Sequence, residues 1–120
     1  MTDRSLPPGL HRDTLAVRTA LERSQYGENS EALFLTSSFV QPDAETSARR
    51  FAGTEEGFTY TRTSNPTVAS FEQRLAALEG TDAAIGASSG MGAILMMCMG
   101  LLKAGDHVVC SRSVFGSTLN

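Results

Sequence analysis

The chain has 120 residues, of which 41% are hydrophobic and 19% are charged, and its formal net charge is −3. This composition is typical of a folded globular chain and excludes a disordered or fibrous one. The thirteen acidic residues outnumber the ten basic ones and no basic block occurs, so we expect no nucleic-acid partner. The longest apolar run, 91–102, is too short to span a membrane. Because the N-terminus lacks a signal-peptide pattern, we expect a cytoplasmic protein.

Short helices joined by loops are predicted for the first part of the chain. Residues 1–12 are expected to form an irregular arm. Asp13 is a candidate N-cap for a helix over 14–23. Residues 32–40 are expected to be extended, and a second helix is predicted over 44–51.

The clearest helix signal follows Asn65, which is a typical N-cap with Pro66 at the first helical position. Gly80 is expected to end this helix. Its apolar residues recur at spacings of three and four and define one face: Val68, Phe71, Leu75 and Leu78.

A strand–helix–strand unit is predicted next, with a strand over 83–87, a helix over 91–102 and a strand over 107–111. Such a unit implies a parallel sheet, whose ligands bind beyond the carboxyl ends of the strands. Two strands cannot close a sheet or cover its faces, so we expect the sequence to be the N-terminal part of a longer protein.

The turn between the first strand and its helix contains Gly90 and Gly92. Glycine lets backbone N–H groups approach a ligand, and a helix start favours an anion, most often a phosphate. An ordinary packed connection would give the same pattern. A P-loop is excluded because no Gly-Lys-Ser/Thr follows, and a dinucleotide site fails because the third Gly and the acidic residue after the second strand are missing.

A coenzyme with one phosphate and an aromatic ring fits these residues better. Ser89 and the N–H groups of Gly90 and Met91 are predicted to bind the phosphate, and Phe115 is placed to stack on a ring. Packing into the core is the equal alternative for Met91. Cys98 and Cys110 lack metal-ligand spacing and are expected to be buried free thiols, and we expect no metal site.

Four stretches in one order resemble the Cys/Met-metabolism pyridoxal-phosphate (PLP) enzymes, which include cystathionine γ-synthase, methionine γ-lyase and the homoserine-ester sulfhydrylases. They are YTRTSNPT at 60–67, LAALEG at 75–80, SGMGA at 89–93 and GDHVV at 105–109. The resemblance implies an α/β, type I PLP-transferase fold. Residues 1–60 would form the N-terminal arm with inter-subunit contacts, and 61–120 the first part of the large, mostly parallel-sheet PLP domain.

The family also implies roles for matching residues. Tyr60 and Arg62 would bind the phosphate of the cofactor held by the neighbouring subunit of a homodimer or homotetramer. From the residues alone, a solvated loop charge is the simpler interpretation of Arg62, and a packing aromatic that of Tyr60. Ser89, Gly90 and Met91 match the phosphate-binding turn.

Phe115 stands where many relatives have a tyrosine that stacks on the pyridine ring. This departure, together with residues 39–46 (FVQPDAET), resembles the O-succinylhomoserine sulfhydrylase branch. The branch implies a γ-replacement in methionine biosynthesis, in which O-succinylhomoserine and sulfide give homocysteine. Cystathionine γ-synthase and methionine γ-lyase activities remain alternatives.

The family holds its cofactor on a lysine, and Lys103 is the one lysine of the sequence. Lys103 follows the predicted helix at its C-terminal end, where a cation is favourable, and it lies away from the phosphate turn. The catalytic lysine is therefore expected beyond Asn120, and the 120 residues alone are expected to be inactive. A non-catalytic fragment that assembles with intact subunits is the alternative of another class.

Overall fold

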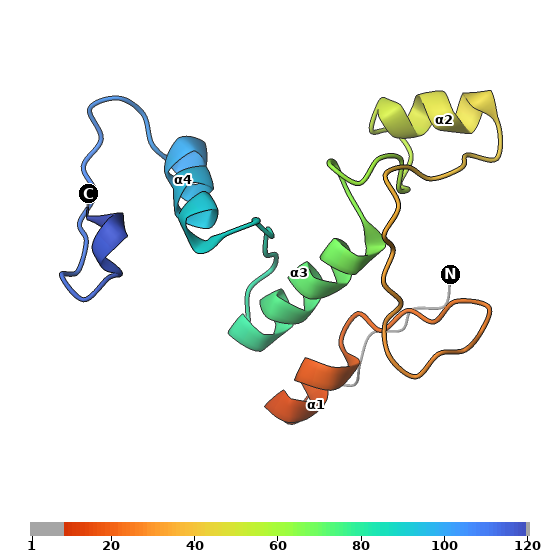
Figure 1. Ribbon diagram of the computed structural model, residues 1–120, viewed down its shortest axis with the longest axis horizontal. Helices are drawn as coiled ribbons and strands as arrows, with labels where there is room; N and C mark the ends of the chain where they lie inside the picture. Colours follow the sequence, from red (N-terminus) through yellow and green to blue (C-terminus); the bar gives the residue numbers. More distant parts are fainter. Residues whose placement is uncertain (1–8, 120) are drawn as a thin grey trace. The chain divides into compact units, whose positions relative to one another are not determined.

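The computed structural model describes residues 9–119, so most of the arm expected over 1–12 lies outside the described residues. The described residues form four α-helices and one 3-10 helix (Figure 1): α1 Arg12–Arg18, α2 Ala44–Phe51, α3 Pro66–Glu79, α4 Gly90–Leu101 and η1 Gly116–Thr118. They divide into two compact units, one ending at Ile85 and the other beginning at Gly86. The predicted domain boundary after residue 60 stays a prediction.

Helices α2, α3 and α4 confirm three predicted helices. Asp43 caps α2 by accepting a 2.7 Å hydrogen bond from the N–H of Thr46. Asn65 caps α3 in the same way, and Gly80 ends it in the left-handed conformation with φ of 67°. Helix α4 begins one residue before the predicted range, and Ser89 is its N-cap.

Helix α1 differs from its prediction at both ends. His11, not Asp13, is the N-cap, and its Nδ1 accepts a 3.3 Å hydrogen bond from the N–H of Asp13. The helix ends at Arg18 because Thr19 is extended, with ψ of 138°. The expected continuation to residue 23 is therefore wrong.

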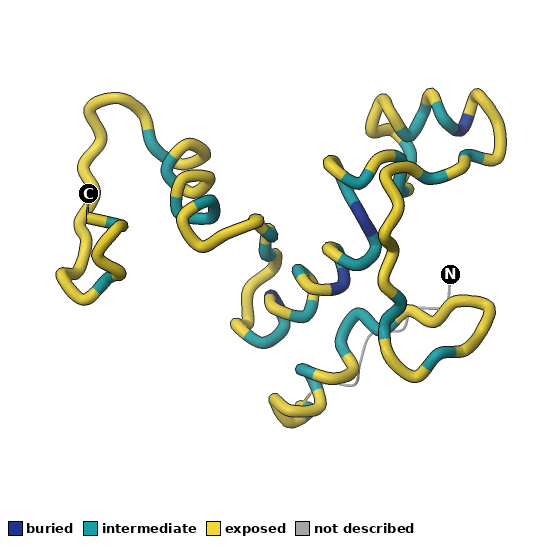
Figure 2. Tube along the Cα trace, viewed as in Figure 1, coloured by how far each residue is buried: buried dark blue, intermediate teal, exposed yellow. Residues whose placement is uncertain are grey.

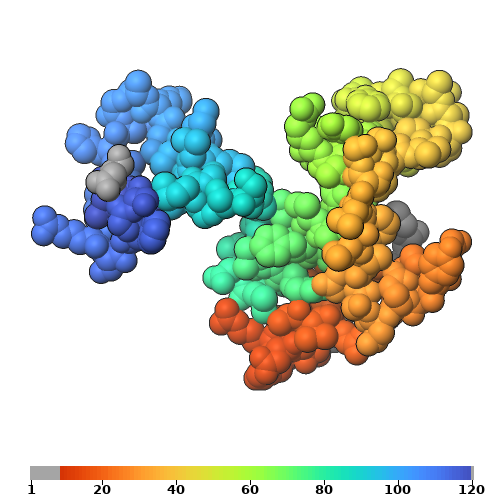
Figure 3. All heavy atoms as spheres, viewed as in Figure 1, coloured from red at the N-terminus to blue at the C-terminus, as the bar shows by residue number. Residues whose placement is uncertain are grey.

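Polar contacts with α3 explain why α1 stops early. The Arg74 guanidinium donates two 3.2 Å hydrogen bonds to the carbonyl of Thr19 and one of 2.7 Å to Glu31. The Ser70 hydroxyl donates to the carbonyl of Ala20, a residue with a positive φ of 57°. Helix α1 also contacts α3 (Figure 3), and these hydrogen bonds hold the residues that follow it. The tertiary hydrogen bonds thus override the helical pattern after residue 18.

The predicted apolar face of α3 is mostly exposed in the described part of the chain; Phe71, for example, is 57% exposed. The buried residues of α3, which belongs to the tube in Figure 2, are instead Ser70 and Ala76, and Ala76 is 5% exposed. Helix α4 carries only intermediate and exposed residues. No helix within residues 9–119 is long and apolar enough to cross a membrane.

The two predicted strands are not formed. Residues 83–87 and 107–111 carry no strand in the structure, and the pairing found among the described residues is one isolated antiparallel bridge between Ser38 and Tyr60. A strand requires a hydrogen-bonded neighbour along its length, and within residues 9–119 these two segments have none.

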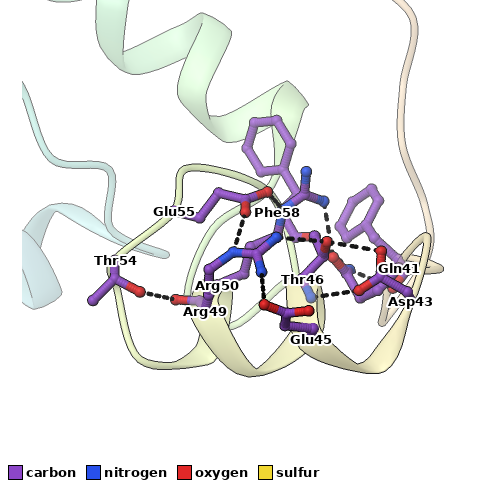
Figure 4. Close-up of polar contacts among 10 residues, drawn as sticks. Gln41, Asp43, Glu45, Thr46, Arg49, Arg50, Thr54, Glu55 and Phe58 are labelled. Atoms are coloured by element: carbon purple, nitrogen blue, oxygen red, sulfur yellow. Dashed lines mark hydrogen bonds and ion pairs between the residues drawn. The ribbon is translucent and has the colours of Figure 1, made fainter.

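A polar network fixes α2 to the chain that follows it (Figure 4). Glu55 accepts hydrogen bonds of 2.8 Å from Arg49 and 3.2 Å from Arg50. Arg50 also donates to Gln41, whose amide donates to the carbonyl of Phe58. The network therefore joins both ends of the α2 region through side chains rather than through an apolar core.

Gly57 is required by this network. A Cβ at residue 57 would lie 2.7 Å from Cδ of Arg50, which is closer than real contacts allow. Arg50 cannot move aside without losing Gln41 or Glu55, so the absence of a side chain at residue 57 lets the network form.

We expect Gly57→Ala to destabilise the native protein by about 1–3 kcal/mol, the usual cost of overpacking. The measurement is the free energy of unfolding in denaturant. Gly100→Ala is the matched control, because a Cβ on Gly100 in α4 meets no atom of the described residues within 4 Å and alanine favours a helix. Equal stability of the two variants would contradict the role of Gly57.

The network also predicts an acid-sensitive stability. The hydrogen bond from Arg49, with a further contribution from Arg50, lowers the pKa of Glu55 below its ordinary value of 4.5. A lowered pKa in the folded state stabilises the fold above pH 4.5, and this stabilisation is lost as the pH falls through the folded-state pKa.

Thermal unfolding followed against pH should therefore show a smaller acid-induced loss of stability in Glu55→Gln than in the unmodified protein. Glu56→Gln is the matched control, because Glu56 makes no ion pair within the described residues. An acid response in Glu55→Gln equal to that of the control would disprove this link.

Candidate cofactor-binding site

The N-terminus of α4 is the centre of the first candidate site. Ser89 is extended, and its Oγ accepts a 3.0 Å hydrogen bond from the N–H of Gly92. The Ser89 carbonyl accepts from the N–H of Ala93 at 2.9 Å. Because Oγ acts here as an acceptor, the hydroxyl hydrogen of Ser89 stays available to a ligand.

The N–H groups of Gly90 and Met91 have no acceptor within residues 9–119. A Cβ built on Gly90 meets no atom of residues 9–119 within 4 Å, so the space beside the Gly90 backbone is open in this part of the chain. The first turn of a helix also carries the positive end of its dipole. Two free amides, one hydroxyl and this dipole together form a cradle that fits a phosphate group.

Phe115 lies in the same unit, directly before η1. The Thr118 hydroxyl donates to Sδ of Met91 at 3.7 Å, which fixes η1 beside the first turn of α4. The Phe115 ring is 74% exposed and is therefore available for stacking. Its packing against a pyridine ring stays a prediction.

Lys103 lies beyond the other end of α4. The helix has 12 residues, so its two ends are about 18 Å apart. The N–H of Lys103 donates to Asp106, and its side chain is exposed. The structure therefore separates the one lysine of the sequence from the N-terminal end of α4.

Tyr60 and Arg62 form a second group, in the unit that ends at Ile85. The Arg62 guanidinium lies 5.3 Å from the centroid of the Tyr60 ring, a cation–π distance. Both side chains are exposed, and Arg62 makes no ion pair within the described part of the chain. A planar guanidinium that is free to pair suits a phosphate.

The loop that contains Tyr60 and Arg62 is held by hydrogen bonds to a single carbonyl group. The Tyr60 carbonyl accepts from the N–H of Thr63 at 2.9 Å, from its hydroxyl at 2.7 Å and from the N–H of Ser64 at 3.1 Å. These bonds close a turn that begins at Tyr60, and Arg62 lies within this turn.

The prediction of buried thiols is wrong for Cys110 and met only in part by Cys98. Both are free, but Cys98 is half-buried and Cys110 is exposed. Within residues 9–119 no group of three His, Cys, Asp or Glu side chains is arranged to hold a metal ion.

Comparisons with known proteins identify the family of the chain. Residues 13–120 match the family model described as Cys/Met metabolism PLP-dependent enzyme. In structure, the chain is similar to a Campylobacter jejuni protein assigned as an O-acetylhomoserine (thiol)-lyase, which contains N'-pyridoxyl-lysine-5'-monophosphate. The TM-score is 0.85 at 31% identity, over 92% of this chain and 27% of that one.

Two relatives are named O-succinylhomoserine sulfhydrylase. The one from Pseudomonas aeruginosa is 55% identical over 90% of this chain and 27% of its own length. The one from Mycobacterium tuberculosis is 42% identical over 97% of this chain and 29% of its own. An L-methionine gamma-lyase of Fusobacterium nucleatum subsp. polymorphum is 43% identical over 88% of this chain and 27% of its own. The chain thus spans less than a third of the length of these relatives.

The fold is that of the type I PLP-dependent enzymes, as the sequence predicted, and the described residues correspond to its N-terminal arm and the start of its cofactor domain. Within this class, the chain belongs to the Cys/Met metabolism PLP-dependent enzymes. The predictions of the family and of its cofactor are confirmed.

Replacing Ser89 tests the start of α4. Ser89→Ala removes the hydrogen bond to Gly92, and we expect it to lower the free energy of unfolding by about 1 kcal/mol, the typical worth of an N-cap. Ser88→Ala is the control, because the Ser88 hydroxyl makes no hydrogen bond within the described residues. Chemical denaturation of the native protein measures both, and equal losses would show that Ser89 is not the cap.

Proposed function

We propose that the protein is a PLP-dependent enzyme that catalyses a γ-replacement, converting O-succinylhomoserine and sulfide to homocysteine and succinate. The observation that carries this proposal is the 55% identity to an O-succinylhomoserine sulfhydrylase over 90% of the chain. The anion-binding start of α4 supports it, because this cradle fits the phosphate of the cofactor.

In the proposed reaction the Cγ–O bond of the substrate breaks and a Cγ–S bond forms. Succinate leaves with the bonding electron pair, sulfide supplies the sulfur, and no oxidant or reductant is needed. The bound cofactor supplies an electron sink for the carbanionic steps. The described residues bind and orient the cofactor rather than carry out the proton transfers.

The roles of the N-terminal turn of α4 follow from its free donors. The N–H groups of Gly90 and Met91 and the hydroxyl of Ser89 would hold the cofactor phosphate. Phe115 would stack on the ring and restrict its rotation. Phenylalanine keeps this stacking but has no hydroxyl, so a proton cannot be moved at this position.

Tyr60 and Arg62 would act on the cofactor phosphate of a neighbouring subunit in a homodimer or homotetramer. The support is that both are exposed and that Arg62 has no ion-pair partner within residues 9–119. An unpaired guanidinium within a fixed turn is suited to reach an anion outside its own unit.

We assign the covalent link with the cofactor to a lysine other than Lys103. A residue about 18 Å along α4 from the phosphate cradle is too far from a ring whose phosphate the cradle holds. Its position after the last turn of α4 suits a cation that stabilises the helix end.

A γ-elimination is the second candidate, because L-methionine gamma-lyases are also among the relatives. Both reactions would use the same cofactor site, and they differ in whether a nucleophile adds at Cγ. The products therefore distinguish them.

The first test is the intact mass of the native protein after borohydride reduction, followed by product analysis. We expect a pyridoxyl-phosphate adduct, and homocysteine from O-succinylhomoserine with sulfide. Cystathionine formed with cysteine in place of sulfide would indicate a synthase. An α-keto acid without a sulfur-containing amino acid would indicate elimination, and the absence of an adduct would overturn the proposal altogether.

A further inference from the structure

Thr61 lies between Tyr60 and Arg62 and is held at three points. Its N–H donates to the carbonyl of Ser37 at 2.9 Å. Its hydroxyl donates to the carbonyl of Thr36 and accepts a 3.1 Å hydrogen bond from the side-chain amide of Asn65. Few residues in an exposed loop are restrained in this way, because most loop side chains are solvated.

Asn65 is the buried centre of this arrangement, with only 3% of its surface exposed. Its Oδ1 accepts from the N–H of Thr67 at 2.8 Å, which is the N-cap of α3. Its Nδ2 donates to the carbonyl of Phe34 at 3.0 Å and to the hydroxyl of Thr61. Every strong hydrogen-bonding direction of the amide except one lone pair is thus occupied.

The direction of these bonds is fixed. The Thr61 hydroxyl has one hydrogen, which it gives to the carbonyl of Thr36, so it can only accept from Asn65. The amide of Asn65 must then donate. A hydrogen-bond network with fixed donor directions thus joins the start of α3 to the turn at residue 61 and to the segment 34–37.

This hydrogen-bond network fixes the backbone from which the side chains of Tyr60 and Arg62 extend. Arg62 has a long side chain that loses conformational freedom when it binds an anion. A backbone already fixed on both sides of Arg62 reduces that loss, which is the usual benefit of preorganisation. The adjacent Tyr60 ring, 5.3 Å from the guanidinium, restricts Arg62 further.

We propose that Thr61 and Asn65 are positioning residues that direct Tyr60 and Arg62 toward the cofactor phosphate without touching it. The proposal rests on the proposed function, because that function supplies the phosphate ligand. In this proposal the side chains of Thr61 and Asn65 determine the conformation of the turn, and the phosphate contacts neither of them.

The test compares two probes, pyridoxal 5'-phosphate and pyridoxal, in the native protein after removal of its cofactor. The ratio measured is the dissociation constant of pyridoxal divided by that of pyridoxal 5'-phosphate. It reports the affinity contributed by the phosphate group alone. A general structural defect weakens both probes and leaves the ratio unchanged. The Thr61→Val variant keeps the shape of the side chain but removes its hydroxyl.

We expect Arg62→Ala to reduce the ratio about tenfold or more, the scale of one charge-assisted hydrogen bond. Thr61→Val should reduce it several-fold, and Thr61→Ser, which retains the hydroxyl, should restore it. Thr54→Val is the matched control, because the Thr54 hydroxyl also donates to a backbone carbonyl, that of Arg49 in α2. It should leave the ratio unchanged.

The double variant Thr61→Val with Arg62→Ala should lose less than the sum of the two single losses, since Thr61 acts partly through Arg62 and partly through Tyr60. Additive losses, or a ratio unchanged in Thr61→Val while Arg62→Ala lowers it, would overturn the positioning role alone. A ratio unchanged in Arg62→Ala would instead overturn the phosphate-binding role in the proposed function. The two failures are therefore distinguishable.

Discussion

The buried amide of Asn65 is the interaction on which much of the first unit depends. It caps α3, it holds the segment at Phe34 through a main-chain carbonyl, and it donates to Thr61. The described residues bury little apolar surface, so hydrogen bonds rather than a hydrophobic core determine the arrangement here. An amide can do this because it combines an acceptor and two donors in one rigid plane.

The network around α2 follows the same rule at a second place. Arg49 and Arg50 share the carboxylate of Glu55, and Gln41 carries the connection to the next segment. In both regions a polar side chain donates to backbone carbonyls that belong to no strand within residues 9–119. This explains how segments without regular structure keep a defined path beside the helices.

Local signals predicted the helices well. Asn65, Pro66 and Gly80 act within a few residues of the helix ends that they define, and the structure has those ends where the sequence places them. The end of α1 was not predictable, because it depends on Arg74, a residue 55 positions away from Thr19. The strands failed for a related reason, since a strand needs a partner that its own residues do not specify.

The residues of the candidate site also differ in whether local sequence signals could predict them. The start of α4 was predicted because glycine and serine have a local role at a helix N-terminus. Tyr60 and Arg62 were found only through the family motif, because an exposed tyrosine and arginine carry no periodic pattern. The contribution of Thr61 was not predictable at all, since its partner Thr36 is 25 residues away.

The turn closed on the Tyr60 carbonyl has a consequence for the length of this loop. Three hydrogen bonds from Thr63 and Ser64 end on that carbonyl, and Asn65 begins α3 directly afterwards. One residue inserted or deleted between Tyr60 and Asn65 would break either the turn or the cap. The number of residues between Tyr60 and Asn65 is therefore fixed. Substitutions are tolerated at some of these positions, but insertions and deletions are not.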